Sequence, residues 1–282
     1  MTVRNDPSAL RWLIGHELRR TRLYAQRTQA DAAKTLDCTP AKINYLEIGR
    51  NQQHPDEVTA LMRLYGADVA DVDRLASLAA RADQGTWWAP FSDVLPNWFK
   101  TFVGLEGLAR AMFTYDVMVL EGQLQTKAYA TALLEDNLRV SRAEAGQVVR
   151  ARMARQRVTD EINPLQYHTV IEEGVLHRTV GGPDVMRAQL AHLLKLAERD
   201  NVTLQVIPTA VAVHDGLAGS FLLLDFAEAR SIGYIEYPHG AVYIQEQDQV
   251  EVYNLVAERL SAQALSDADS ADVIRARIVA LS

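Results

Sequence analysis

The sequence predicts an all-α N-terminal head followed by an α+β domain with a mainly antiparallel sheet. The head is expected because capped, amphipathic segments, about five in number, fill its first part. The second class is expected because alternating, strand-like segments mix with helical ones from residue 113 onward. A chain of 282 residues, 48% hydrophobic and 23% charged, is long enough for two packed domains. We divide it into a head (1–82), an aromatic-rich connecting segment (83–112) and a second domain (113–282).

The head is expected to contain short helices in quick succession. Ser8 is placed to cap the first, from Ala9 to about Ala25, and Thr28 and Thr39 to cap the next two. Pro40 suits the first position of the third helix, and Gly49 suits its end. The buried face of the first helix is predicted to carry Leu10, Leu13, Ile14, Leu18 and Leu23. Two further helices are predicted over residues 55–65 and 71–82.

The connecting segment is too apolar for a flexible linker, and we expect a helix from Pro96 to about Ala111. It holds three of the four tryptophans, Trp87, Trp88 and Trp98. Such crowding fits either a contact between domains or subunits, where aromatic anchors are enriched, or an ordinary core.

The second domain is predicted to mix both element types, ending in two helices. Strands are expected at 113–120, 166–174, 202–209, 219–226, 231–238 and 241–247. Helices are expected at 127–134, 141–159, 183–199, 247–264 and 268–281. The last three strands are separated by turns short enough for an antiparallel meander.

The charge distribution favours a nucleic-acid-binding head. The whole chain carries a net charge of −7, with 29 Lys and Arg against 36 Asp and Glu. Residues 1–66 hold 10 basic and 7 acidic side chains, or +3, which leaves 19 and 29, or −10, for the remainder. A basic head on an acidic body is typical of a nucleic-acid-binding module attached to another domain.

Composition excludes several other classes. The single cysteine, Cys38, excludes an intramolecular disulfide and a multi-thiolate zinc site, which fits a reducing cytoplasm. The N-terminus lacks the apolar core of a signal peptide, and no apolar run reaches the roughly 18 residues that a membrane helix requires. We expect a soluble, cytoplasmic protein without a membrane partner, a metal or a cofactor.

The second and third predicted helices have the spacing of a helix-turn-helix, in which the second helix lies in the DNA major groove. The stretch is TQADAAKTLDCTPAKINYLEIGR, residues 28–50. Its inward side is predicted to be Ala32, Ala33, Leu36, Ile43 and Leu46. Its outward side at the second helix is Pro40, Ala41, Lys42, Asn44 and Tyr45. A helical hairpin that binds protein is the alternative.

This stretch resembles the Cro/CI-type (XRE) helix-turn-helix of transcriptional regulators, in its Thr-Gln opening, its Thr cap and its terminal Leu-Glu-x-Gly. The resemblance implies a double-stranded DNA operator as partner and a homodimer as the working form. The DNA-contacting residues are then Gln29, Thr39, Pro40, Ala41, Lys42, Asn44 and Tyr45, with Arg50 and Asn51 at the phosphates.

Two positions depart from the family pattern, which has Gly-Leu at Gln26-Arg27 and often Gly at Asp37. Arg27 could lay its aliphatic stem over the apolar site. Cys38 lies in the turn, as an oxidation sensor or as a small buried filler.

Separated blocks of the second domain resemble actinobacterial regulators of the WhiJ-like, Scr-type antitoxin-like group. These include LQTKAYATALL, VGGPDVMRAQLAHLLKLAERDNVTLQVIP and HDGLAGSFLLLDF. One departure is Glu121, where that group usually has proline. The resemblance implies a transcriptional regulator whose second domain senses a small-molecule effector or a small companion protein. The alternative is an antitoxin-like adaptor that neutralises such a companion through residues 113–282.

One group of polar residues near the last strands is a candidate ligand site, suited to a small polar molecule. It comprises His214, Asp215, Glu236, Tyr237, His239 and Tyr243. The alternative is that the two histidines are turn residues satisfied by the backbone.

Enzymatic activity is not expected. HELRR at 16–20 lacks the second histidine of a zinc protease motif, and no nucleophile elbow or phosphate-binding loop is present. Glu172, with His214, Asp215 and Glu236, could supply acid and base, but nothing in their spacing requires it. The basic segment at 148–161 carries Arg150, Arg152, Arg155 and Arg157, either as an extension of the DNA footprint or as a solvated face.

Overall fold

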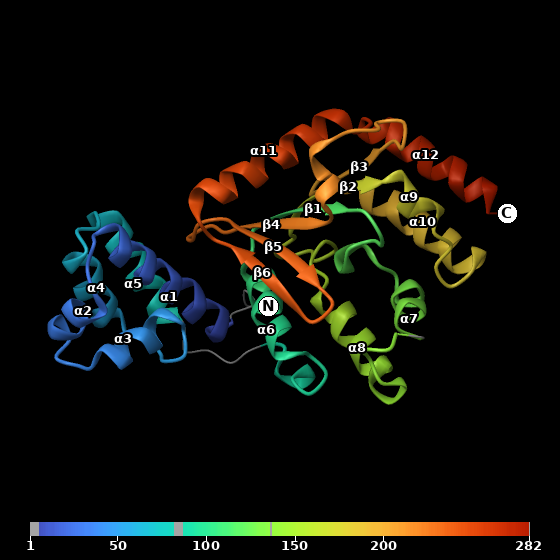
Figure 1. Cartoon of the computed structure of the whole chain (residues 1–282). Helices are drawn as coiled ribbons and strands as arrows, with labels where there is room; N and C mark the ends of the chain where they lie inside the picture. Colours follow the sequence, from blue (N-terminus) through green and yellow to red (C-terminus); the bar gives the residue numbers. More distant parts are fainter. Residues whose placement is uncertain (1–5, 82–86, 136, 282) are drawn as a thin grey trace. The chain divides into compact units, whose positions relative to one another are not determined.

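A computed structural model describes residues 6–81, 87–135 and 137–281. The chain forms two compact units (Figure 1). The first comprises the residues up to Pro90 together with Lys100–Leu108, and the second comprises Phe91–Phe99 and the chain from Ala109 onward. Each unit is described below by itself.

The first unit is entirely helical in its described residues. Its helices are α1 (Pro7–Tyr24), α2 (Gln29–Thr35), α3 (Pro40–Glu47), α4 (Pro55–Leu64), α5 (Val69–Arg81) and most of α6 (Asn97–Leu108). One core joins them, with Ile14, Ile43 and Val58 fully buried at its centre. Apolar residues at helical spacing on each segment build this core, as the sequence predicts.

The start of α1 differs from the prediction. Asp6, and not Ser8, is the N-cap: its Oδ1 accepts hydrogen bonds from the backbone N–H groups of Ser8 (2.9 Å) and Ala9 (3.0 Å). Pro7 then occupies the first helical position, which suits its fixed φ. Leu23, predicted to point inward, is 56% exposed, whereas Leu10, Leu13, Ile14 and Leu18 are buried as predicted. Residue 82, the predicted end of the fifth helix, lies outside the described residues.

Two residues of the first unit adopt the left-handed backbone conformation without being glycine. They are Gln26, with φ +54°, and Asp37, with φ +47°. These are the positions where the Cro/CI-type pattern has glycine. The left-handed conformation costs a residue with a Cβ about 1–2 kcal/mol, and aspartate tolerates it better than most. The Arg27 side chain, next to Gln26, is exposed.

The second unit contains a single six-stranded sheet within its described residues. Its strands are β1 (Ala111–Asp116), β2 (Gln166–Glu172), β3 (Val202–Ile207), β4 (Phe221–Asp225), β5 (Ile232–Tyr237) and β6 (Gly240–Ile244). Its helices are α7 (Lys127–Glu135), α8 (Arg142–Arg155), α9 (Glu173–His177), α10 (Pro183–Ala197), α11 (Gln247–Gln263) and α12 (Asp267–Ala280). Single 3₁₀ turns are η1 (Ala89–Phe91), η2 (Gly122–Leu124) and η3 (Asp215–Ala218).

The strand order is β3-β2-β1-β4-β5-β6. β4, β5 and β6 form the predicted antiparallel meander, and β4 also pairs antiparallel with β1. β1, β2 and β3 are parallel to one another, which the sequence did not predict. The parallel pairs require crossovers, supplied by α7 and α8 between β1 and β2, and by α9 and α10 between β2 and β3.

α11 covers one face of this sheet (Figure 1). Its Ala257 and Leu260 pack in one buried cluster with Tyr115, Phe221 and Leu223. The neighbouring side chain, Thr114, points to the opposite face, because successive side chains of a strand alternate. The sheet therefore has an α11 face and a Thr114 face, and these names are kept below.

Candidate nucleic-acid interface

α2 and α3 form the predicted helix-turn-helix. Thr28 begins α2 in a capping box with Asp31, and the Thr39 hydroxyl accepts from the Lys42 N–H at 3.3 Å at the start of α3. Pro40 occupies the first helical position of α3. The predicted inward set is confirmed: Ala32, Ala33, Ile43 and Leu46 are buried and Leu36 packs against the same core.

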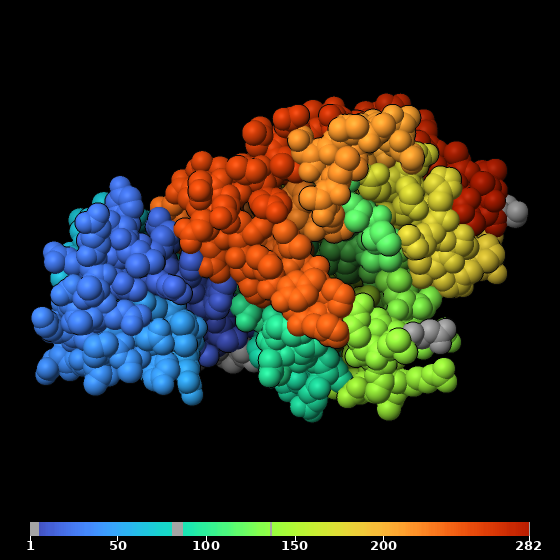
Figure 2. Space-filling view, in the orientation of Figure 1, coloured from blue at the N-terminus to red at the C-terminus, as the bar shows by residue number. Residues whose placement is uncertain are grey.

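The opposite side of α3 is exposed, and residues of this part of the chain form the mid-blue area of the first unit in Figure 2. The exposed members of the predicted DNA-contacting set are Thr39, Pro40, Ala41, Asn44, Tyr45 and Arg50. Gln29, Lys42 and Asn51 are partly exposed. The helix is thus apolar toward the core and polar outward, the arrangement needed by a helix that inserts into a groove.

A buried ion pair holds α3 against α1. Arg22 Nε donates to Glu47 Oε1 at 2.5 Å, and Arg22 Nη2 donates to Glu47 Oε2 at 2.9 Å. Gln29 Nε2 adds a third bond to Glu47 Oε2, at 2.9 Å, and approaches Asn44 Oδ1 at 3.4 Å. The hydrogen bond to Glu47 raises the pKa of Arg22. Arg22 and Glu47 fix the orientation of α3, and sequence reasoning did not single them out.

The C-terminal end of α3 lies close to the backbone of α1. A Cβ on Gly15 of α1 would lie 2.5 Å from the Leu46 carbonyl oxygen, so only glycine allows this approach. Gly49, which ends α3 as predicted, has φ +69°, and a Cβ there would lie 2.9 Å from the Arg11 carbonyl carbon. Gln53 Nε2 also donates to the Leu46 carbonyl, at 2.6 Å. These contacts attach the C-terminal end of α3 closely to α1.

Lys42 does not extend freely from α3. Its Nζ lies 2.6 Å from Glu57 Oε1 on α4, in a pair that is partly exposed. The hydrogen bond to Glu57 raises the Lys42 pKa. A surface pair of this kind contributes about 0–1 kcal/mol, so a phosphate group competes with it readily.

Tyr45 and Arg50 form one exposed unit. The Arg50 guanidinium carbon lies 4.8 Å from the centre of the Tyr45 ring. The backbone N–H groups of Arg50 and Asn51 both donate to the Tyr45 carbonyl, at 2.9 and 3.1 Å. In the part of the chain that the structure describes, Arg27, Lys34 and Arg50 make no ion pair, which leaves their charges available to an anionic partner.

Cys38 is partly exposed in the turn between α2 and α3. Burial raises the pKa of its thiol, which disfavours the reactive thiolate. Its Sγ lies 3.6 Å from the Thr39 carbonyl oxygen.

The residues predicted to bind a ligand are divided between the two faces of the sheet. His214 is on the α11 face: its Nδ1 accepts from the Gly216 N–H at 3.2 Å and its Nε2 lies 3.1 Å from Glu172 Oε1. Tyr115 donates its hydroxyl to the same Glu172 oxygen. Asp215 forms an ion pair with Arg259 at 2.8 Å.

The other predicted residues lie on or near the β5–β6 hairpin. Glu236 accepts from the Tyr234 hydroxyl at 3.2 Å, and the Tyr243 hydroxyl donates to the Trp98 carbonyl at 3.3 Å. Tyr234 pairs across the strands with Leu222, which in turn pairs with Thr114, so Glu236 belongs to the Thr114 face. Tyr237 and His239 are exposed at the turn. The six residues therefore do not share one face.

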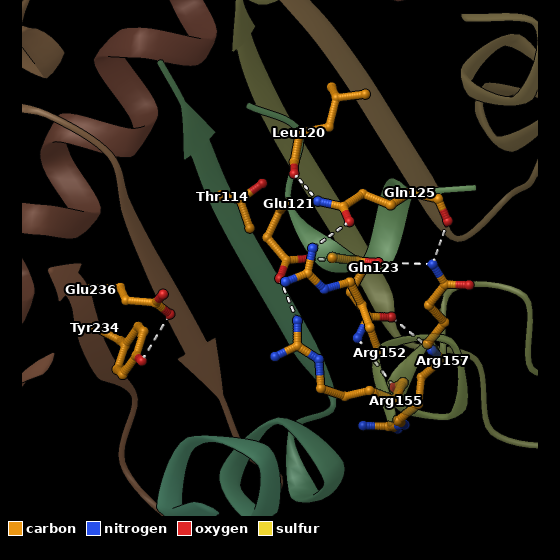
Figure 3. Close-up of polar contacts among 12 residues, drawn as sticks. Thr114, Leu120, Glu121, Gln123, Gln125, Arg152, Arg155, Arg157, Tyr234 and Glu236 are labelled. Carbon is orange, nitrogen blue, oxygen red and sulfur yellow. Dashed lines mark hydrogen bonds and ion pairs between the residues drawn. The ribbon is translucent and has the colours of Figure 1, made fainter. Parts of the chain in front are cut away.

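The arginine-rich segment is mostly not the solvated face considered from the sequence, because three of its four arginines contact other parts of the second unit. Arg157 is 2% exposed and donates to the carbonyl oxygen of Ala109 at 2.6 Å. Arg152 donates to Gln125 at 2.9 Å, and Arg155 pairs with Glu121 at 3.0 Å (Figure 3). The Arg152 and Arg155 side chains fix the turn at residues 120–126 from within the second unit. Only Arg150 is exposed.

Glu121 takes over the role of the family's usual proline. Its φ of −63° is the value that proline prefers, and its side chain accepts from the Gln123 N–H at the start of η2. The turn therefore keeps the φ that proline would have, while Glu121 adds a hydrogen bond from its N–H to Asp116 Oδ2 at 3.3 Å and an ion pair to Arg155.

No group of three or more metal-binding side chains occurs among residues 6–81, 87–135 and 137–281. Over the same residues, none of the helices combines the length and the apolar character needed to cross a membrane.

Comparison with protein families agrees with the two-unit architecture. Residues 13–75 match a helix-turn-helix domain, and residues 99–276 match a domain of unknown function, DUF5753. No curated protein and no solved structure matches the chain. The helix-turn-helix match at the N-terminal end indicates an element suited to binding DNA. The DUF5753 match spans more than half of the chain, and the chain therefore belongs to the DUF5753 family.

Proposed function

We propose that this protein is a sequence-specific transcriptional regulator that inserts α3 into the DNA major groove. The observation that carries the proposal is the two-sided structure of α3. Ile43 and Leu46 anchor it in the core, while Asn44 and Tyr45 are exposed on the other side. The buried Arg22–Glu47 pair holds α3 in that orientation. The exposed side chains of α3 are therefore pre-organised for binding.

The chemistry of the exposed side chains suits DNA. An asparagine side chain can pair with N6 and N7 of adenine, and Lys42 can reach guanine or phosphate. The Arg50 side chain suits backbone phosphates, and Arg27 and Lys34 extend the basic surface of the same unit. One such head contacts only a half-site, so the working form is a homodimer on a pseudo-palindromic operator.

The second unit is the sensing part of this regulator, for a small-molecule effector or a small companion protein. The protein acts in the cytoplasm and has no catalytic role. The division of the chain into a DNA-facing unit and a larger α+β unit supports this arrangement.

The test is fluorescence anisotropy of labelled duplex DNA with the full chain, after selection of bound sequences from a random pool. Tyr45→Ala and Lys42→Ala should each weaken specific binding by about 1–3 kcal/mol, since each removes a contact at the groove. Arg63→Ala, an exposed position on α4, is the matched control and should leave the affinity unchanged.

Circular dichroism of each variant keeps folding separate from binding. If the Tyr45 and Lys42 variants are folded and bind the selected duplex as tightly as the unmodified protein, α3 is not the recognition helix. If the full chain binds no duplex even at low salt, the proposal of a DNA-binding regulator is wrong.

A further inference from the structure

A groove of about 720 Å³ opens in the second unit between α11 and the α11 face of the sheet. One row of paired residues runs along it across four strands: Thr203, His168, Phe113 and Leu223. Paired residues of neighbouring strands point to the same face, so this row forms one wall. None of the residues that the sequence indicated for a ligand lines this groove.

The other wall is one side of α11. Asn254, Ala257, Glu258 and Ser261 lie at intervals of three and four residues, the spacing of a single helix face. Ala257 and Leu223 are buried and Phe113 is partly buried, so the floor is apolar. The rim is polar. An apolar floor with a few polar groups is typical of a small-molecule site.

The hydrogen bonds around His168 determine which of its ring nitrogens is free. Gln205 Nε2 donates to the carbonyl oxygens of Ser261 and Leu265, at 3.3 and 3.0 Å, so its Oε1 is the atom that lies 2.8 Å from His168 Nε2. An amide oxygen only accepts, and therefore His168 Nε2 carries the hydrogen.

The remaining contact of the ring is consistent with this tautomer. The Ser261 hydroxyl donates to the Ala257 carbonyl at 2.8 Å, so its oxygen, 3.4 Å from His168 Nε2, is not a donor to the ring. Nδ1 of His168 keeps its lone pair and accepts no hydrogen bond from any residue within the described ranges. His168, a lining residue of the groove, thus offers an acceptor.

The charge of the lining is negative. It includes three carboxylates, Asp200, Asp225 and Glu258, and no lysine or arginine. Arg110 neutralises Asp225 at 2.6 Å, whereas Asp200 and Glu258 make no ion pair with the residues that the structure describes. The Phe113 ring, whose centre lies 5.2 Å from that of His168, adds an aromatic surface beside them. Aromatic faces and carboxylates both attract cations.

We propose that this groove binds a small organic cation: a protonated amine with an apolar, preferably aromatic, body. The ammonium N–H donates to His168 Nδ1, Glu258 and Asp200 balance its charge, and the apolar body lies on Phe113, Leu223 and Ala257. The cation would be the effector that the second unit senses, and this role as effector rests on the proposed function.

The experiment is isothermal titration calorimetry of the full chain without DNA. 2-Phenylethylammonium should bind saturably with one site per chain. Phenyltrimethylammonium has the same charge and a ring but no N–H, and should bind about fivefold more weakly. Phenylacetate, of opposite charge, should not bind. No saturable binding of 2-phenylethylammonium in the millimolar range, or equal binding of all three compounds, would overturn the proposal.

Matched variants locate the site. Asp200→Asn combined with Glu258→Gln should weaken 2-phenylethylammonium binding about tenfold, since each surface charge contributes up to about fivefold. Asp248→Asn combined with Glu251→Gln removes the same charge from positions of α11 outside the groove and should have no effect. An equal loss in both double variants would show that the cation responds only to the net charge of the protein.

A separate anisotropy titration, with DNA and with saturating 2-phenylethylammonium, tests the link to regulation. A changed DNA affinity supports the effector role. Groove binding with unchanged DNA affinity would confirm the site and refute that role, whereas failure of DNA binding itself would not affect the calorimetric result.

Discussion

Removal of the Glu47 carboxylate should loosen the attachment of α3 to α1. In Glu47→Ala, the guanidinium of Arg22 loses both of its bonds to this carboxylate, at 2.5 and 2.9 Å, and Gln29 loses the bond at 2.9 Å. The Arg22 and Glu47 side chains are 8% and 2% exposed, so water replaces these bonds poorly. Leaving one partner of a buried pair alone costs about 3–5 kcal/mol.

Hydrogen exchange of the α3 amides measures this cost in the full chain. Because about 1.4 kcal/mol corresponds to a factor of ten, exchange should accelerate by about 100-fold or more in Glu47→Ala. Asp71→Ala breaks the more exposed ion pair with Arg74 and should change the exchange rate of the α3 amides by about fivefold or less. The double change Arg22→Met with Glu47→Leu should restore most of the protection, because no unpaired charge remains. Acceleration of less than about threefold in Glu47→Ala would refute the assigned role of this pair.

Three further predictions concern the backbone, pH and salt. Gln26→Gly and Asp37→Gly should each raise the free energy of unfolding of the first unit by about 0.5–1 kcal/mol in urea titrations, because both positions have positive φ. Arg27 does not have a positive φ, so Arg27→Gly should not stabilise the first unit. Burial raises the pKa of the Asp116 carboxyl group well above its usual value in the folded protein. As the pH rises above about 4, the Asp116 carboxyl group therefore ionises in the unfolded chain before it ionises in the folded one, and this lowers the stability of the folded state. Asp116→Asn should therefore stabilise the second unit at pH 7, measured by thermal denaturation, with a gain that vanishes below about pH 4. Arg50→Ala should reduce the slope of log affinity for DNA against log salt by about 1.

Local signals in the sequence predicted the helix-turn-helix well. Thr28, Thr39, Pro40 and Gly49 act within one turn of the helix ends that they define, so their positions could be read directly. The first cap was wrong because Asp6 and Ser8 are both good N-cap residues; a proline in between favours the first helical position, which points to Asp6.

Long-range partners escaped the sequence analysis. Arg22 and Glu47 are 25 residues apart, and nothing in the pattern of either helix shows that they meet. Arg157 looked like a surface residue because its charge is visible in the sequence, whereas the carbonyl groups that satisfy it are not. The parallel pairing of β1 with β2 likewise depends on contacts across 55 residues, as between Thr114 and Thr169.

The candidate ligand site was placed by proximity in sequence, which does not determine the face of a sheet. His214 and Glu236 come from neighbouring segments, yet they belong to opposite faces. The α11 groove is built from rows across four strands and one helix, so it could be recognised only once the strand register was known.

If the exposed side of α3 reads DNA, its side chains determine which bases the protein prefers. Binding sites should be selected from random duplexes by the full chain and by Asn44→Ala, at the same salt concentration. The variant should lose its preference at one position of each half-site, by about 1–3 kcal/mol, and keep its preferences at the other positions. An identical set of preferred bases for the two proteins, repeated with Tyr45→Ala, would contradict this role of α3.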